Sequence, residues 1–372
     1  MNRRDVLFYA AIALGLALRV WLTATTFGSS DVLYKTTWSH LAERYGVAQA
    51  YAHSPFMNDP PLAVAVSVAL DRFGARTGIA FGDLFRFVQT LADLVSLACL
   101  ALLARRETAL AYFLSPAAIM ISGFHCNSDP SMIACVLLAA LLLARDKPAS
   151  SGAALAMATG VKVVPLLLLP IFLIAARKHV ARFGAAWTAM MALLFGVPAA
   201  IGGVAVLRNT FLYKSVGNWW GVVSMLHFAG AMNAEHFFRV ANTIVVLAAV
   251  AAITLLFAQN RITLLAACGL VFTSLLVLGA GFGVQYLLWP LAFLPFFAPR
   301  LLRFGVHASA ALFLFTVYTH WSRGLPWFFA NSDATDATTT SLVIFGWLVW
   351  ALMAAAAVAG VRAGFSHQKE SS

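Results

Sequence analysis

The sequence is organised around residues 31–62, which read DVLYKTTWSHLAERYGVAQAYAHSPFMNDPPL. This stretch is polar and aromatic and ends in two prolines, whereas the chain on both sides of it is mainly apolar. A connection of this length tends to be functional or disordered. Because it contains enough Trp, Tyr and Leu to fold against other residues, we predict that it is functional. Its polar residues of most interest are Asp31, Glu43, Asn58 and Asp59.

The composition indicates a polytopic membrane protein. Of the 372 residues, 62% are hydrophobic and only 10% are charged, and the mean hydropathy is +0.85. A soluble domain carries about 25% charged residues. The net charge of +11 comes from short Lys and Arg clusters between apolar runs, which is the pattern of cytoplasmic loops. We therefore expect membrane lipids, and no nucleic acid, as partners.

The apolar runs predict an all-α bundle of about 11–13 transmembrane or half-membrane helices, which form a single integral-membrane domain over residues 1–372. A full span needs about 20 apolar residues, and shorter segments can be half-inserted. Arg3 and Arg4 place the N-terminus in the cytoplasm, so the first loop, 24–60, is exoplasmic and the tail, 362–372, is cytoplasmic. The spans are expected at 6–23, 86–104, 108–122, 131–144, 183–206, 240–258, 262–281, 283–298, 304–321 and 340–361, with 61–84 either juxtamembrane or a bent span.

Three charged residues fall inside the apolar segments. Lys162 interrupts residues 152–176, where two half-length apolar runs predict a broken helical hairpin with this lysine at its tip. Asp93 lies in the span 86–104, and an ionisable residue there is either functional or paired. We favour pairing with another polar group of the bundle. Arg19, near the end of the first span, is expected to extend to the membrane interface.

The predicted topology gathers a set of polar residues at the exoplasmic face. Carboxylates, cations and aromatic residues together at a membrane surface suit a substrate that has a lipid part and a phosphate. Arg and Lys would bind the phosphate oxygens, and Asp31 or Asp59 would act as a base. The alternatives are that an exposed carboxylate is only solvated and that His125 is a hydrogen-bonded turn residue. The set contains Asp31, Asn58, Asp59, His125, Asn127, Asp129, Arg208, Lys214, Asn218 and Arg323, with Lys162 directed to the same cavity from the membrane.

Several stretches occur in an order typical of one family. They are Asp31 after the first span, Asn58-Asp59-Pro60-Pro61-Leu62, Phe85-Arg86 to Asp93, Ser115-Pro116 to Asn127, Gly160-Val161-Lys162 to Pro165, and Arg208 to Trp219. Over roughly its first 220 residues the chain resembles the GT-C superfamily of integral-membrane glycosyltransferases, which use polyprenyl-phosphate-linked sugars. It is most similar to the glucosyltransferases of the endoplasmic-reticulum dolichol pathway and to bacterial polyprenyl-phosphomannose-dependent mannosyltransferases. It departs from the dolichol-pathway glucosyltransferases in two ways. No Tyr separates Asp59 from the prolines, and a later His-Glu-Lys is absent. The resemblance therefore does not determine which sugar is transferred or which acceptor receives it.

The resemblance implies a hexosyltransferase that inverts the configuration of the transferred mannose or glucose. Asp31 would be the general base, with Asp59 and Asp129 as possible second carboxylates. The donor phosphate would lie on Arg208, Lys214 and Lys162, and the acceptor or sugar pocket would contain Asn58, His125, Asn127 and Trp219. The acceptor would be a lipid-linked glycan, a glycolipid or another hydroxyl compound. Some members of the superfamily require a divalent cation, so that cofactor is possible, although no metal-ligand set is visible in the sequence.

Two other function classes fit the sequence. Broken helices and an intramembrane lysine also suit a transporter or lipid flippase. A non-catalytic assembly protein with the same fold is the third reading. The Ala- and Leu-rich chain with short loops favours a bacterial inner membrane, with the active site on the periplasmic side.

Overall fold

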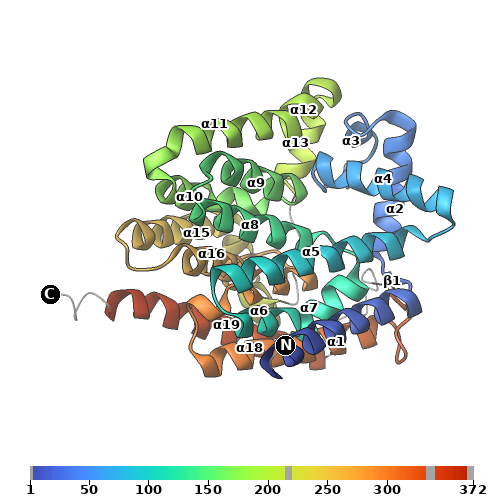
Figure 1. The fold of residues 1–372 in the computed structure, drawn as a ribbon. Helices are drawn as coiled ribbons and strands as arrows, with labels where there is room; N and C mark the ends of the chain where they lie inside the picture. Colours follow the sequence, from blue (N-terminus) through green and yellow to red (C-terminus); the bar gives the residue numbers. More distant parts are fainter. Residues whose placement is uncertain (1–2, 214–219, 332–339, 367–372) are drawn as a thin grey trace. The chain divides into compact units, whose positions relative to one another are not determined.

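The computed structural model describes residues 3–213, 220–331 and 340–366, and within them the chain is almost entirely helical (Figure 1). The predicted all-α polytopic class is confirmed. By length and composition, six helices of the described residues could cross a membrane, or seven if the bent pair Arg106–Phe113 and Pro116–His125 forms one span. Four shorter apolar helical segments accompany them, at Asp129–Ala144, Val164–Ala175, Leu264–Leu278 and Val284–Phe296.

The chain divides into two compact units. The first consists of Met1–Leu169, Ala176–Tyr213 and Ser322–Asp333, and the second of Pro170–Ala175, Lys214–Trp321 and Ala334–Ser372. Each unit is therefore built from segments that are distant in the sequence. The organisation of residues 1–372 as a single membrane domain stays a prediction.

The first unit contains every described residue of the predicted site. Within it, α5, α8, α9 and α11 pack in succession, each against the next, and α2 lies beside α4. Its elements are α1 Arg3–Thr25, β1 Gly28–Ser29, α2 Asp31–Tyr45, α3 Ala50–His53, α4 Pro61–Thr77, α5 Phe81–Leu103, α6 Arg106–Phe113, α7 Pro116–Met120, η1 Ile121–His125, α8 Asp129–Ala144, α9 Pro148–Val161, η2 Val164–Leu168, η3 Arg177–His179, α11 Val180–Met191, η4 Ala192–Gly196, α12 Val197–Gly202, α13 Val204–Phe211 and β2 Phe329–Ala330.

The second unit begins one residue into α10 and contains the later helices. Its described elements are α10 Leu169–Ala175, α14 Gly221–Phe228, α15 Met232–Ala258, α16 Leu264–Leu278, η5 Val284–Leu287, α17 Leu288–Leu291, η6 Leu294–Phe296, α18 Arg300–Trp321 and α19 Thr340–Ser366. In this unit α15 and α19 both pack against α16, and α18 packs against α19.

The predicted exoplasmic loop, 24–60, has more regular structure than the sequence suggested. Asp31 begins α2, where a carboxylate is favoured by the partial positive charge of a helix N-terminus. Gly46 ends this helix with a φ of 84°, a conformation that glycine adopts without strain. Pro61 occupies the first turn of α4, where its missing N–H costs nothing. The predicted functional loop is thus mainly helical.

One predicted span is not a continuous helix. Residues 283–298 do not form a continuous helix but three short pieces, η5, α17 and η6. Pro290 and Pro295 lie within this stretch, and proline both lacks the N–H of a helical hydrogen bond and clashes with the preceding turn. The segment is therefore apolar but does not form one continuous helix.

Candidate functional site

Asp31 lies at the centre of a polar cluster in the first unit. The Asn127 side chain donates a hydrogen bond from Nδ2 to Asp31 Oδ2 at 2.6 Å, and His125 Nε2 lies 3.4 Å from the same oxygen. Within the described residues, no hydrogen bond is made to Asp31 Oδ1. The side chain is 23% exposed. One carboxylate oxygen is therefore anchored, while the other accepts no hydrogen bond from the described residues.

The charges around Asp31 favour its ionised form. Burial alone would raise its pKa, but His125, Lys35 and the Asn127 hydrogen bond together hold the pKa of Asp31 below its usual value. For Lys35, burial would lower the pKa, but the carboxylates of Asp59 and Asp31 outweigh burial and raise the pKa. The structure thus places a carboxylate beside a lysine that stays protonated.

Lys35 joins Asp31 to the second predicted carboxylate, Asp59. It lies one helical turn after Asp31 on α2, and its Nζ is 2.5 Å from Asp59 Oδ2 and 5.0 Å from the centre of the Phe85 ring. The lysine side chain is only 3% exposed. The Tyr51 hydroxyl donates to the main-chain oxygen of Asp59. Asp59 therefore fixes the end of the loop and neutralises Lys35, and the half-buried Asn58 precedes it.

Lys162 and Asp129 are paired with each other. Lys162 Nζ lies 2.9 Å from both carboxylate oxygens of Asp129, and 3.4 Å from Asn127 Oδ1. The Asp129 side chain is fully buried, and that of Lys162 is 16% exposed. Lys162 follows the last residue of α9 and has an extended backbone, so the helix breaks where the sequence analysis placed a break. Through Asn127, this pair is connected to Asp31.

His125 ends a short π-helical turn, and Asn127 follows it two residues later. Residues Ile121–His125 form a single turn of π-helix, a feature that is frequent at functional sites. Cys126 then has a φ of 67°, which reverses the chain, and the backbone N–H of Ser128 donates to Asn127 Oδ1 at 2.7 Å. That bond fixes the Asn127 amide so that its Nδ2 faces Asp31.

The strand pair β1–β2 fixes the start of α2. Gly28 and Ser29 pair in parallel with Phe329 and Ala330, and the Ser30 N–H donates to the Ala330 oxygen at 2.8 Å. The Ser29 hydroxyl donates to the main-chain oxygen of His125. These bonds join the segment before Asp31 to the turn that carries His125.

Arg19 does not extend to the membrane interface, and this expectation is wrong. Its side chain is fully buried, and Nη2 lies 2.9 Å from Oδ2 of the equally buried Asp93. Arg19 Nε donates to the Ser122 hydroxyl at 2.8 Å, and Tyr112 donates to Asp93 Oδ1 at 2.7 Å. An oppositely charged partner in the bundle makes burial less costly than the sequence alone implied. The predicted pairing of Asp93 is confirmed.

Gly123 allows α1 to approach the π-helical turn closely. A Cβ atom at this position would lie 3.1 Å from the Arg19 Cα atom and 3.2 Å from its main-chain oxygen. The Thr23 hydroxyl donates to the Gly123 oxygen at 3.2 Å. The buried ion pair of Arg19 thus lies directly against the turn that carries His125.

The roles of Lys35 and Arg86 were not predicted from the sequence. Arg86 is fully buried, and its guanidinium donates to the Thr26 hydroxyl at 2.8 Å and to the main-chain oxygens of Thr26 and Thr23 at 2.8 and 3.2 Å. It also pairs with Asp83 at 2.8 Å. Arg86 therefore satisfies the carbonyl groups at the end of α1. Two features of the sequence could have indicated these roles. A lysine lies one helical turn after Asp31, and an arginine lies three residues after Asp83.

Three predicted site residues, Arg208, Lys214 and Trp219, are not seen in this cluster. Arg208 is exposed on α13, and its Nε lies 3.4 Å from Asn209 Oδ1. Asn209 in turn donates to the main-chain oxygens of Tyr51 and Ser54 at 3.0 and 3.1 Å, which anchors α13 to α3. Lys214 and Trp219 lie outside the described residues.

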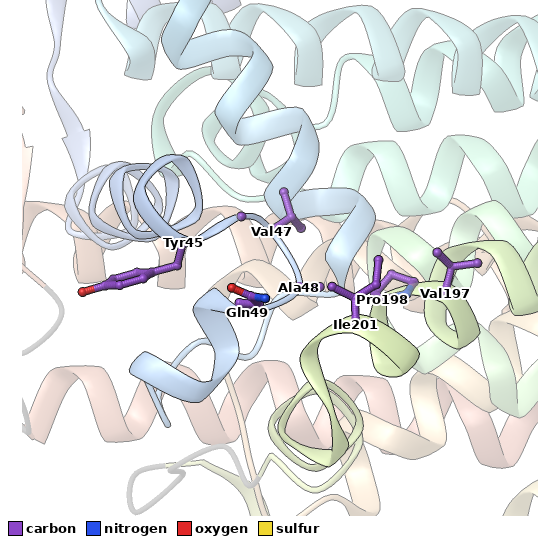
Figure 2. Close-up of a pocket in the computed structure, with 8 residues that line it drawn as sticks. Tyr45, Val47, Ala48, Gln49, Val197, Pro198 and Ile201 are labelled. Carbon is purple, nitrogen blue, oxygen red and sulfur yellow. The ribbon is translucent and has the colours of Figure 1, made fainter.

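An apolar hollow of about 370 Å³ lies at the other end of α2. Figure 2 shows Val197, Pro198 and Ile201 of α12 around it, together with Ala48 and the amide-bearing Gln49 from the loop after α2. Val197 and Ile201 are exposed and belong to the span Arg177–Gly202, so the hollow borders a surface suited to hydrocarbon.

No metal-binding set is formed by the residues that the structure describes, because no three His, Cys, Asp or Glu side chains come together as a metal ion would require. The possible divalent cation therefore has no identified ligands, and no chemical step is assigned to it.

The comparisons with known proteins give one family and no curated relative. The family model of glycosyltransferase family 87 matches residues 56–279, which is more than half of the chain. No curated protein matches the chain. The matched segment includes Asp59, His125, Asn127 and Lys162 but not Asp31, so the role of Asp31 depends on the geometry described above.

Proposed function

Because the chain belongs to glycosyltransferase family 87, we propose that it transfers a hexose, mannose or glucose, from a polyprenyl phosphate to an acceptor hydroxyl with inversion. The protein is a multi-pass membrane glycosyltransferase. The proposed refinements are the lipid-linked donor, the inverting reaction and an active site on the exoplasmic, periplasmic side of a bacterial inner membrane. The observation that carries the proposal is the partly exposed carboxylate of Asp31, which is anchored through Oδ2 and accepts no hydrogen bond at Oδ1 from the described residues.

Asp31 acts as the general base in this reaction. Its free Oδ1 accepts the proton of the acceptor hydroxyl, and the acceptor oxygen attacks the anomeric carbon from the face opposite the phosphate. The bond from the anomeric carbon to the phosphate oxygen breaks, and the polyprenyl phosphate leaves with the electron pair. A single displacement of this kind inverts the anomeric configuration. A positioned base typically contributes about 10²–10⁴-fold to the rate.

The cations near Asp31 have different roles. Lys35 is occupied by Asp59 and supports the ionised form of Asp31. Lys162 Nζ lies 3.4 Å from Oδ1 of Asn127, the residue that also contacts Asp31. In this proposal Lys162 interacts with both Asp129 and the leaving phosphate. Arg208, exposed on α13, is a further phosphate ligand in this proposal, as is Lys214. Preorganised cations of this type stabilise the negative charge that develops on the leaving group.

The donor chain requires an apolar surface. The hollow between α12 and the loop after α2 supplies one, because Val197 and Ile201 continue it onto a membrane span. It lies at the end of α2 opposite Asp31, fourteen residues or about 21 Å along the helix. A polyprenyl chain is long enough to reach from one end to the other.

The test is donor turnover by purified wild type and Asp31→Asn. Synthetic short-chain polyprenyl-phosphate mannose and glucose are supplied separately, and release of polyprenyl phosphate is followed, including slow hydrolysis, so that no acceptor has to be known. Asp31→Asn keeps the shape of the side chain, and we expect it to lower turnover by about 10²–10⁴-fold.

Asp146→Asn is the matched control, because the Asp146 side chain is 85% exposed and lies outside the cluster. It should turn over the donor as fast as wild type. Full turnover by a folded Asp31→Asn protein would contradict the assignment of the base, and Asp59→Asn and Asp129→Asn would then be tested. Absence of turnover of both donors by folded wild type would instead favour the transporter or assembly-protein readings.

A further inference from the structure

A second, apolar groove lies within the second unit, between α15, α16 and α19. Its volume is about 500 Å³, which is within the range of small-molecule sites. Small side chains on α15 and α19 leave room for it, and one cation stands at one end. The groove is lined by, among others, Ala249, Ala252, Leu270, Ala357, Val361 and Phe365, together with Arg261.

The backbone holds Arg261 at the end of the groove. After α15, Asn260 has a φ of 56°, and the N–H of Arg261 donates to the Leu256 oxygen at 3.0 Å, which is a helix-ending turn of the Schellman type. Thr263 then caps α16 by accepting from the Ala266 N–H at 3.3 Å. The turn is thus fixed at both of its helices.

The last helix packs closely against this turn. A Cβ atom at Gly364 would lie 3.3 Å from the main-chain oxygen of Arg261 and 3.0 Å from the Ile262 side chain. The Arg261 guanidinium lies over the Phe365 ring, 4.8 Å from its centre. Stacking of this kind occupies the face of the guanidinium and leaves the N–H groups in its plane for a ligand.

The Arg261 side chain is half-buried, and no carboxylate of the described residues pairs with it. Every other lining residue except Gln259 and Ser274 is apolar. The groove therefore offers one unneutralised positive charge at the end of a hydrocarbon surface.

The dimensions fit one leaflet of a bilayer. From Ala249 to the end of α15 at Ala258 is nine residues, or about 14 Å at the rise of an α-helix, and Arg261 follows in the turn. The hydrocarbon core of one leaflet is about 15 Å thick, half of the usual core. An acyl chain that begins at the level of Arg261 would therefore lie along the whole groove.

We propose that this groove binds an anionic phospholipid, with its phosphate on Arg261 and one acyl chain between α15, α16 and α19. Arginine binds phosphate oxygens with two parallel N–H bonds, and the apolar lining replaces neighbouring lipid around the chain. Basic pockets between membrane helices on the cytoplasmic side are typical sites for anionic headgroups, and the positive-inside pattern places Arg261 on that side. The inference is independent of the proposed sugar transfer.

The experiment compares lipid retention by four forms of the full chain. Wild type, Arg261→Gln, Ala252→Leu and the control Arg300→Gln are purified in detergent and incubated with dioleoyl phosphatidylglycerol or dioleoyl phosphatidylcholine. Native mass spectrometry then counts bound lipid. Ala252 is exposed in the groove, so a leucine there fills it without disturbing buried packing. Arg300 is exposed at the start of α18 and does not line the groove.

We expect wild type and Arg300→Gln to retain one phosphatidylglycerol in preference to phosphatidylcholine. In Arg261→Gln the preference for phosphatidylglycerol over phosphatidylcholine should fall about fivefold, which is the effect of one basic residue near a lipid surface. Ala252→Leu should lose the bound lipid of either kind. Equal retention by wild type and Arg261→Gln, or an equal loss in Arg300→Gln, would overturn the proposal. Displacement of the lipid by an equimolar short-chain polyprenyl phosphate would also overturn it, because the groove would then be a polyprenyl site.

Discussion

The buried ion pair between α1 and α5 gives the sharpest prediction about stability. Arg19 Nε and Nη2 lie 3.0 and 2.9 Å from Asp93 Oδ2, and both side chains are fully buried. Substitution Asp93→Asn removes the negative charge and keeps the shape. Arg19 then remains buried without its counter-charge.

The magnitude follows from the geometry. Two unit charges 2.9 Å apart attract each other by about 6 kcal/mol at an effective dielectric constant of 20. Part of this attraction offsets the cost of removing the charges from water, and breaking a buried pair by removing one partner typically costs about 3–5 kcal/mol. We expect Asp93→Asn to lower the free energy of unfolding by that amount. The double variant Arg19→Met/Asp93→Leu should recover most of it, because no charge is left unpaired.

The assay is denaturant-induced unfolding in detergent micelles, followed by tryptophan fluorescence, for wild type, Asp93→Asn, the single variants Arg19→Met and Asp93→Leu, and the double variant. The control is Asp5→Asn, which breaks the exposed pair of Asp5 with Arg106 and should cost less than about 1 kcal/mol. The reasoning is refuted if Asp93→Asn costs no more than Asp5→Asn. It is also refuted if the double variant is as unstable as the two single variants summed.

Two further predictions concern the polar cluster. Lys35→Gln removes a positive charge that helps to lower the pKa of Asp31, so that pKa should rise. Since the base must be ionised, activity is present above this pKa and is lost as the pH falls through it. The acid limb of the kcat/KM profile should therefore move to higher pH, whereas Lys35→Arg should leave it near the wild-type position; an unmoved limb in Lys35→Gln would contradict the role of Lys35. Lys162→Gln removes the cation that lies 2.9 Å from the fully buried Asp129 and should lower the free energy of unfolding by about 3 kcal/mol or more in the same assay. Lys162→Gln/Asp129→Asn should be more stable than Lys162→Gln alone, and no such recovery would mean that the pair is not an isolated unit.

The sequence by itself determined the class of the protein and much of its helical layout. Long apolar segments with basic residues between them predicted the polytopic all-α fold, and the helices α1, α5, α15, α18 and α19 lie where those segments do. Apolar length is a local property, so it can be read from the chain. At residues 283–298 the apolar length did not predict a continuous helix, because the segment contains Pro290 and Pro295 and is divided into short pieces.

The tertiary structure alone decided which charges meet. Asp31, Asn127 and Lys162 are far apart in the chain, yet one hydrogen-bond network joins them, and Lys162 has Asp129 as its partner. Arg19 was expected at the membrane interface but pairs with Asp93, 74 residues away. The energy of a buried charge depends on the partner that another segment supplies, and no local pattern specifies that partner. The sequence could therefore identify the ionisable residues, but only the fold could show that Asn127 and His125 meet Asp31 at one carboxylate oxygen.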